Sequence, residues 1–260
     1  MMQVNLMGFS APQTDSTKSM LSKERRWLIS QAGADFFFFQ NRRYPREAAL
    51  EWVGNRYQLT HMERMLLHRG IFSQEKGLRR RAKCCKGAGW QSQLLAVDGH
   101  NVQITLESAI LGRPLLMSND GALRDLAGQS ARFRFSEVSE MAVDTLFRFL
   151  EEFRPHRVLF LFDAPMSHSG RLADIYRRRL KSLRIPGEAR AVPVPEREFP
   201  YEGAVVATSD SAVINEVSHW LDLARGAIEW SGILELAADF SSLILANPTE
   251  QYSLTDQSLF

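Results

Sequence analysis

The chain has 260 residues, enough for one large domain or two small ones with apolar cores. Apolar residues make up 45% and charged residues 24%, beside 16 Gly and 10 Pro, which excludes collagen-like and broadly disordered chains. The two cysteines, Cys84 and Cys85, are adjacent and provide neither a disulfide framework nor a C-x-x-C zinc motif. No apolar run approaches the ~18 residues of a membrane span, and the stretch before Lys18 is a poor secretory signal because it carries no basic residue. We therefore expect a cytoplasmic protein with no membrane partner.

The net charge of +2 conceals two segments of opposite charge. Residues 17–90 carry 16 Lys and Arg against 6 Asp and Glu, a balance of +10, whereas residues 91–260 carry 16 against 23, a balance of −7. A nucleic-acid-binding segment beside a cation-binding site would produce this asymmetry. An ordinary solvated basic surface is the alternative.

Helical periodicity in the N-terminal part predicts three helices. The first follows Ser22, and the second begins at Pro45, which suits a first helical turn. The third begins at Thr60, whose spacing to Glu63 is that of a capping box, and ends at Gly70. We predict a small helical module over residues 17–75.

A run of charge follows this module. Residues 76–86 include three consecutive arginines and precede a Gly-Ala-Gly sequence. This composition predicts a basic linker over residues 76–92. Within the module, the four consecutive phenylalanines at 36–39 are interpreted as helix core.

After Trp90, short apolar runs alternate with amphipathic segments, which is typical of an α/β fold. Buried parallel strands are predicted at 94–97, 157–162 and 204–208, with weaker candidates at 114–117 and 189–194. Helices are predicted at 102–111, 137–153, 172–183, 211–220 and 232–245. Residues 93–250 thus form, by prediction, an α/β domain with an open parallel sheet flanked by helices.

Each of the three strongest strands ends in an aspartate: Asp98, Asp163 and Asp210. Because the carboxyl ends of parallel strands share one edge of a sheet, these carboxylates can converge. Carboxylate oxygens, together with the amide oxygen of Asn101, suit Mg²⁺ or Mn²⁺, and phosphodiester hydrolysis is the usual work of such a site. For each aspartate alone, a helix N-cap is the alternative.

The motifs around these aspartates resemble those of PIN-like nucleases, specifically their NYN branch. The sequence reads D-G-H-N at 98–101, F-D-A at 162–164 and A-T-S-D at 207–210, and the match covers about residues 93–223. The resemblance implies a PIN/NYN-like fold and a Mg²⁺ or Mn²⁺ site lined by Asp98, Asn101, Asp163 and Asp210. Ser209 would support this site.

The whole chain also resembles an uncharacterised prokaryotic two-domain family, domain of unknown function 434 with a C-terminal PIN-like partner. Residues 41–60, N-R-R-Y-P-R-E-A-A-L-E-W-V-G-N-R-Y-Q-L-T, carry this resemblance. It implies membership of a nuclease fold and no established substrate.

A fourth carboxylate is less clearly marked. Many NYN nucleases carry a further acidic pair between the second and third motifs, where this chain has only Asp174 before three arginines. Asp120 is the preferred substitute as a metal ligand, with Asp174, Glu196 and Asp222 behind it. The Asp-Gly pair at 120–121 is equally a turn signal.

The loop at 167–171 is a candidate phosphate site. The hydroxyls of Ser167 and Ser169 and the guanidinium of Arg171 could hold a phosphate. An ordinary loop that caps a helix is the alternative.

These observations predict a Mg²⁺- or Mn²⁺-dependent nuclease with Asp98, Asp163 and Asp210 as catalytic residues and Ser209, Ser167, Ser169 and Arg171 as substrate-binding residues. The preference for RNA rests on the resemblance alone. One rival is a catalytically silent PIN-like module that binds nucleic acid or a ribonucleoprotein, with the carboxylates acting only as caps. A phosphatase-type enzyme is disfavoured because no D-x-D follows any predicted strand.

Overall fold

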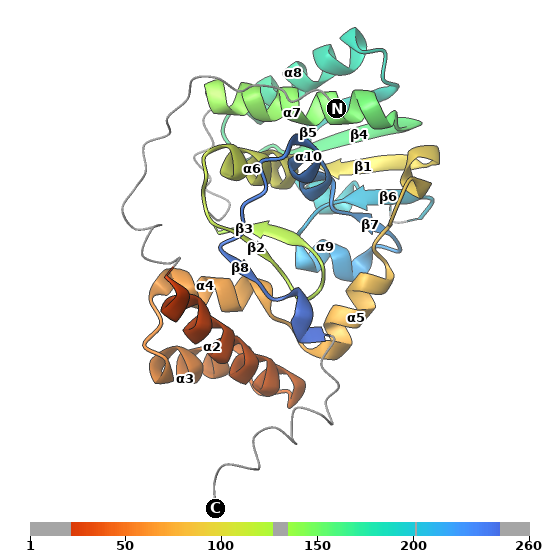
Figure 1. Ribbon diagram of the computed structural model, residues 1–260. Coiled ribbons are helices and arrows are strands. Elements are labelled where there is room, and N and C mark those ends of the chain that lie inside the picture. Colours follow the sequence, from red (N-terminus) through yellow and green to blue (C-terminus); the bar gives the residue numbers. More distant parts are fainter. Residues whose placement is uncertain (1–21, 127–134, 201, 245–260) are drawn as a thin grey trace, which may run out of the picture.

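The computed structural model describes residues 22–126, 135–200 and 202–244 (Figure 1). The predictions for residues before 22 and for the end of the α/β domain up to residue 250 lie outside these ranges. Among the described residues, no helix has the length and apolar character needed to cross a membrane.

Three N-terminal helices pack together as predicted. They are α2 (Lys23–Asn41), α3 (Arg46–Arg56) and α4 (His61–Gly70). The hydroxyl of Ser22 accepts from the Arg25 N–H and starts α2. Thr60 and Glu63 form the predicted capping box of α4, with the Thr60 N–H donating to the Glu63 carboxylate at 2.8 Å.

The phenylalanine run on α2 is only partly core. Phe36 and Phe37 are buried among α2–α4, but 39% of Phe38 is exposed. Because successive residues on a helix lie about 100° apart, four in a row cannot all face the same core. The prediction that the whole run is core is therefore wrong for Phe38.

The segment predicted as a basic linker contains two elements. Helix α5 (Gln74–Ala82) begins at Ser73, whose hydroxyl accepts from the Lys76 N–H, and the short 3-10 helix η1 (Gly89–Ser92) follows. The side chain of Arg80 is only 3% exposed and forms an ion pair with Asp120. The charge run was misinterpreted because a buried arginine with a carboxylate partner looks the same in sequence as a solvated one.

A five-stranded parallel sheet forms the centre of the C-terminal part. Its order is β5 (Gly187–Val192), β4 (Arg157–Asp163), β1 (Leu94–Asp98), β6 (Ala204–Ala207) and β7 (Trp220–Leu221). Helices cover both faces, so the predicted α/β class with a flanked parallel sheet and a preceding helical region is confirmed (Figure 1).

The two faces of this sheet carry different helices. One face packs against α6 (Gly99–Ile110), α7 (Glu137–Phe153), α8 (Ser169–Ser182) and α10 (Leu223–Ser231). The other face packs against α9 (Ser211–Glu216) and the segment around the 3-10 helix η2 (Pro195–Arg197). Burial on both faces explains why β1, β4 and β6 read as continuous apolar runs.

A second, three-stranded sheet lies between the N-terminal helices and the large sheet (Figure 1). Its order is β3 (Leu123–Asp125), β2 (Leu115–Met117) and β8 (Ala238–Asp239). Leu116 of β2 and Phe240 after β8 share one core with α2, α3 and α4. The helix predicted over 232–245 is wrong, because α10 ends before Gly232 (φ 73°) and the chain then forms β8 and the 3-10 helix η3 (Ser241–Ile244).

Candidate active site and the adjoining basic cavity

The three predicted aspartates lie at one edge of the large sheet. Asp98 and Asp163 are the last residues of β1 and β4, and Asp210 follows β6 by three residues. Strands β4, β1 and β6 are neighbours and parallel, so all three residues leave the sheet at its carboxyl edge.

Asp98 is held on both of its carboxylate oxygens. Oδ1 accepts from the Asn101 N–H at 3.3 Å and caps α6, and Oδ2 accepts from the Thr208 hydroxyl at 3.0 Å. Burial raises the pKa of Asp98 to about 7; the charges of Asp210 and Glu196 add to this shift, and the two hydrogen bonds oppose it. Asp98 thus caps α6, and the negative charges of Asp210 and Glu196 also act on it.

Asn101 connects the loops after β1 and β6. Its Oδ1 accepts from the backbone N–H of Ser209 at 2.8 Å and from the Ser209 hydroxyl at 3.0 Å. Asp210 caps α9 by accepting from the Ala212 N–H at 2.6 Å. Because both hydrogen bonds from Ser209 occupy the amide oxygen of Asn101, this oxygen orients the loop of Asp210 and does not face the site as a ligand.

Asp163 is positioned through its backbone. Its N–H donates to Nδ1 of His100 at 3.0 Å, and the ring of His100 packs edge-on against Phe162. Burial lowers the pKa of His100 to about 4, so this imidazole is neutral at pH 7 and positions Asp163. Within the described part of the chain, the Asp163 carboxylate accepts no hydrogen bond, and burial, reinforced by the charge of Glu196, raises its pKa.

Glu196 is the fourth acidic residue at this edge. It lies in η2, after β5, and its charge raises the pKa of both Asp98 and Asp163. Glu196 stands behind Asp120 among the predicted ligands, although it follows the predicted weak strand at 189–194. Its segment reaches the edge only through the sheet order, which the sequence pattern does not reveal.

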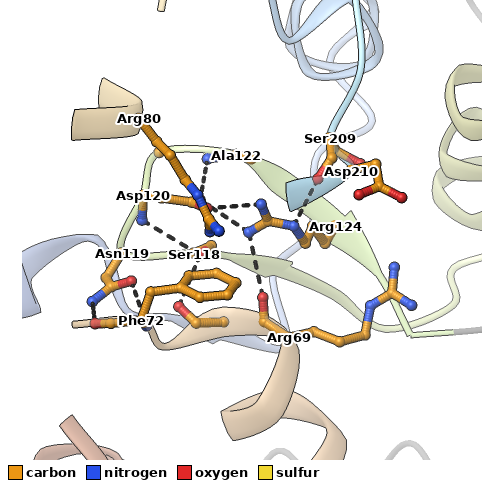
Figure 2. Close-up of polar contacts among 12 residues, drawn as sticks. Arg69, Phe72, Arg80, Ser118, Asn119, Asp120, Ala122, Arg124, Ser209 and Asp210 are labelled. Atoms are coloured by element: carbon orange, nitrogen blue, oxygen red, sulfur yellow. Dashed lines mark hydrogen bonds and ion pairs between the residues drawn. The ribbon is translucent and has the colours of Figure 1, made fainter. Parts of the chain in front are cut away.

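Asp120 occupies a different position from the one predicted. It lies in the turn between β2 and β3, fully buried, where its Oδ2 accepts from Arg80 at 2.8 Å and from Arg124 at 2.8 Å (Figure 2). Its Oδ1 accepts from Arg124 at 2.9 Å and from the Ala122 N–H at 3.2 Å. With both oxygens engaged, Asp120 does not fit a metal ligand, and the turn alternative describes it, with Gly121 at φ 92°.

The carboxylates at the edge are spread out. Within residues 22–126, 135–200 and 202–244, no three His, Cys, Asp or Glu side chains form a group that could hold a metal ion by themselves. Any cation at this edge would therefore be bound by fewer direct protein ligands and by water.

The predicted phosphate loop is only partly assembled. Ser167 is exposed, whereas the Ser169 hydroxyl donates to the Ala164 carbonyl at 3.2 Å and starts α8. The guanidinium of Arg171 lies 5.4 Å from the ring centroid of Phe135, in a separate cavity of about 430 Å³. The structure thus turns Arg171 toward α7 and away from the other two residues. Ser169 is the first residue of α8, and the N-cap position belongs to His168, whose side chain makes no capping hydrogen bond.

A basic cavity of about 910 Å³ opens beside the aspartate edge. The N-terminal helices line one side, and Asn101, Ser209 and Asp210 line the other. Its wall carries six basic side chains: Arg43, Arg46, Arg69, Lys76, Arg80 and Arg124. The acidic residues of its wall are Glu75, Asp125 and Asp210.

This cavity is not among the sites predicted from the sequence. The only available signal was the +10 balance of residues 17–90, and Arg124, which lies outside that segment, carried no signal. Arg124 joins the two sides, since its Nε donates to the Ser209 carbonyl at 2.8 Å and its Nη1 to the Arg69 carbonyl at 3.3 Å (Figure 2).

Fold and site together define an α/β protein with an N-terminal helical region and an acidic sheet edge beside a basic cavity. Residues 88–226, more than half of the chain, match the family described as "Domain of unknown function (DUF5616)". Residues 28–83 match "Protein of unknown function (DUF434)", which confirms that predicted resemblance for the N-terminal region, helix α5 included. The chain therefore belongs to the DUF5616 family and carries a DUF434 region.

The chain is also similar to a relative over most of its own length. "Uncharacterized protein MJ0935" of Methanocaldococcus jannaschii is 32% identical over 204 residues, which cover 78% of this chain and 97% of the relative. No solved structure matches this chain.

Proposed function

We propose that this protein is a divalent-metal-dependent nuclease of the PIN/NYN type that hydrolyses phosphodiester bonds in RNA. The observation that carries the proposal is the position of Asp98, Asp163 and Asp210 along one sheet edge, with the charge of Glu196 acting on two of them. The choice of RNA follows from the resemblance of the three motifs to NYN nucleases.

The carboxylates of Asp98, Asp163, Asp210 and Glu196 suit a hard cation that takes its remaining ligands from water. All four side chains offer carboxylate oxygens, the ligands that Mg²⁺ and Mn²⁺ prefer. Mg²⁺ commonly binds proteins through one or two carboxylates and keeps several waters, so an edge without a compact group of three ligands can still hold it. When bound, such a cation would polarise the scissile phosphate and stabilise the leaving oxygen.

The surrounding residues hold these carboxylates in place. Thr208 orients Asp98 through its hydroxyl, and His100 fixes the backbone of Asp163. Asn101 ties down the loop that carries Asp210. The adjoining basic cavity would draw the polyanionic substrate toward an edge that otherwise repels it.

A catalytically silent nucleic-acid-binding module is the second candidate. Two observations favour it: Asp98 and Asp210 both cap helices, and no three potential ligands form a compact group among the described residues. In that case the basic cavity alone would carry the function.

Paired substitutions at Asp98 and Asp163 separate the two candidates. Asn keeps the shape of Asp and caps helices about as well, so Asp98→Asn and Asp163→Asn should leave the unfolding temperature without metal within about 2 °C. Mn²⁺-dependent cleavage of a single-stranded RNA should fall at least about 100-fold, because a charged oxygen ligand is lost. Asp174→Asn, an exposed change on α8, is the matched control and should cleave normally. Wild-type cleavage rates in both variants would contradict the proposal.

A further inference from the structure

The six basic side chains of the cavity carry more charge than the two buried carboxylates beside them, Asp120 and Asp125, can balance, and Asp125 pairs with Arg69. The guanidinium carbons of Arg46, Arg80 and Arg124 lie 4.9, 4.1 and 5.2 Å from the ring centroid of Phe72. Asp120 pairs with Arg80 and Arg124. Arg46 instead donates to two neutral oxygens, the Gln40 side chain and the His68 carbonyl.

The crowding of the guanidinium groups changes the pKa of Arg46. Burial lowers the pKa of Arg46 to about 10; repulsion from Arg80 and Arg124 adds to the shift, and the charges of Glu47 and Asp120 oppose it. An anion in the cavity would relieve this repulsion, which points to an anionic ligand.

Two buried donors in the cavity wall support the same conclusion. Within the described part of the chain, Nε of Arg69 and Nε2 of Gln40 are buried and have no hydrogen-bond partner. Both are N–H groups, and a buried unsatisfied donor costs about 1–3 kcal/mol. Both atoms are closed to solvent, so an acceptor oxygen of a ligand, such as a phosphate oxygen, would reach them once these side chains turn toward the cavity.

An exposed aromatic group stands at the border of the cavity. The rings of Tyr44, which lines the cavity, and Trp52 lie 6.1 Å apart, and both pack edge-on against Phe39. Tyr44 is 44% and Trp52 is 51% exposed. Exposed aromatic rings beside a positive groove are the arrangement that binds single-stranded nucleic acids, because every unpaired base can stack on them.

We infer that the cavity binds a single-stranded nucleic-acid segment, with its phosphates against the arginines and an unpaired base stacked on Tyr44 or Trp52. Cavities of roughly 300–1,000 Å³ hold small ligands, so this one accommodates one or two nucleotides and not a duplex. Asn101, Ser209 and Asp210 line the same cavity, so the strand continues onto the aspartate edge. This last step rests on the proposed nuclease function, whereas the binding itself does not.

Binding in the presence of a chelator tests the inference apart from cleavage. The probe is a fluorescein-labelled 12-nucleotide RNA, measured by anisotropy with the full chain in EDTA, beside a DNA strand of the same sequence and the RNA duplex. Tyr44→Ala and Trp52→Ala should each weaken single-strand binding about tenfold, because base stacking is lost. Trp52→Phe should restore most of the affinity, and Trp27→Ala, an exposed change on α2 outside the cavity, should have no effect.

The basic side chains are tested by salt dependence. Arg43→Gln and Lys76→Gln should each make the slope of log affinity against log salt shallower by about one, since each removes one phosphate contact. Arg79→Gln is the matched control, because Arg79 lies on the same helix as Lys76, is exposed and does not line the cavity.

Three outcomes would overturn the inference: no RNA binding in EDTA, duplex binding as tight as single-strand binding, or unchanged affinity in both aromatic-to-alanine variants. Equal binding of RNA and DNA would support it and assign the recognition to the shared phosphates and bases. Asp163→Asn should bind like the wild type. If binding follows these expectations while no protein cleaves, the inference stands and the nuclease proposal falls.

Discussion

Asp120 shows how a residue suited to metal chemistry can serve structure instead. It has no exposed surface and accepts from two buried arginines that come from different elements, Arg80 on α5 and Arg124 on β3. Removing one partner of a buried charged pair leaves the others uncompensated. Asp120 therefore links α5 to the small sheet.

Asp120→Asn should lower the free energy of unfolding by about 3–5 kcal/mol, because two buried guanidinium groups lose their carboxylate. Urea unfolding at pH 7 measures this change. Asp174→Asn, in an exposed pair with Arg177, should stay within about 0.5 kcal/mol of the wild type. A loss below about 1 kcal/mol at Asp120 would show that the cluster is not needed for stability.

The stability difference between wild type and Asp120→Asn should also depend on pH. Burial alone would raise the pKa of Asp120, but the charges and hydrogen bonds of Arg124 and Arg80 outweigh it and lower the pKa to about 2. A carboxylate with a depressed folded-state pKa stabilises fully above its unfolded value of about 3.9. The difference should be constant above pH 5 and shrink as the pH falls from about 4 toward 2. A difference that grows in acid would contradict this assignment.

At the scale of elements, the junction of β1 and α6 depends on a close approach at Gly99. A Cβ atom there would lie 2.4 Å from Cε1 of Phe162, a buried core ring on β4. Gly99→Ala should therefore lower the free energy of unfolding by about 1–3 kcal/mol, through overpacking. Gly170→Ala on α8 is the control, since nothing lies within 4 Å of its Cβ position. Equal stability of the two variants would show that α6 can shift freely.

Elements buried on both faces were the ones that sequence could predict. Strands β1, β4 and β6 are continuous apolar runs, and α7 has the predicted bounds, with capping at Ser136. The strands β3, β7 and β8 were missed because each is only two or three residues long and is defined by its partners. Helix α5 was not predicted because its charge run reads as solvated, whereas Arg80 is buried against residues distant in sequence, Asp120 and Asn215.

The candidate site, too, could be predicted only where a local sequence pattern determines it. Asp98, Asp163 and Asp210 could be predicted to share one sheet edge, because continuous apolar runs indicate parallel strands and the carboxyl ends of parallel strands lie at the same edge. The position of Glu196 and the basic cavity depend on how distant segments pack, so no local pattern could reveal them.

The whole molecule brings the basic N-terminal helices against the acidic sheet edge. The helices α2, α3 and α4 share a core with Leu116 and Phe240, and Arg124 hydrogen-bonds to both sides of the cavity (Figure 2). The opposite charges of residues 17–90 and 91–260 therefore meet at one cavity. In the proposed nuclease, the helices would bind the polyanion and the sheet edge would hold the cation that acts on it.

A crystal structure of the full chain soaked in Mn²⁺ tests this account most directly, because the anomalous signal locates the ion and its ligands. We predict one Mn²⁺ ion at the carboxyl edge of β1, β4 and β6, with Asp163 and at least one of Asp98, Asp210 and Glu196 in contact with it or with its waters. The peak should disappear in Asp163→Asn crystals and persist in Asp174→Asn crystals. An aspartate edge without an ion at saturating Mn²⁺, or an ion elsewhere in the molecule, would contradict the proposed metal-dependent nuclease.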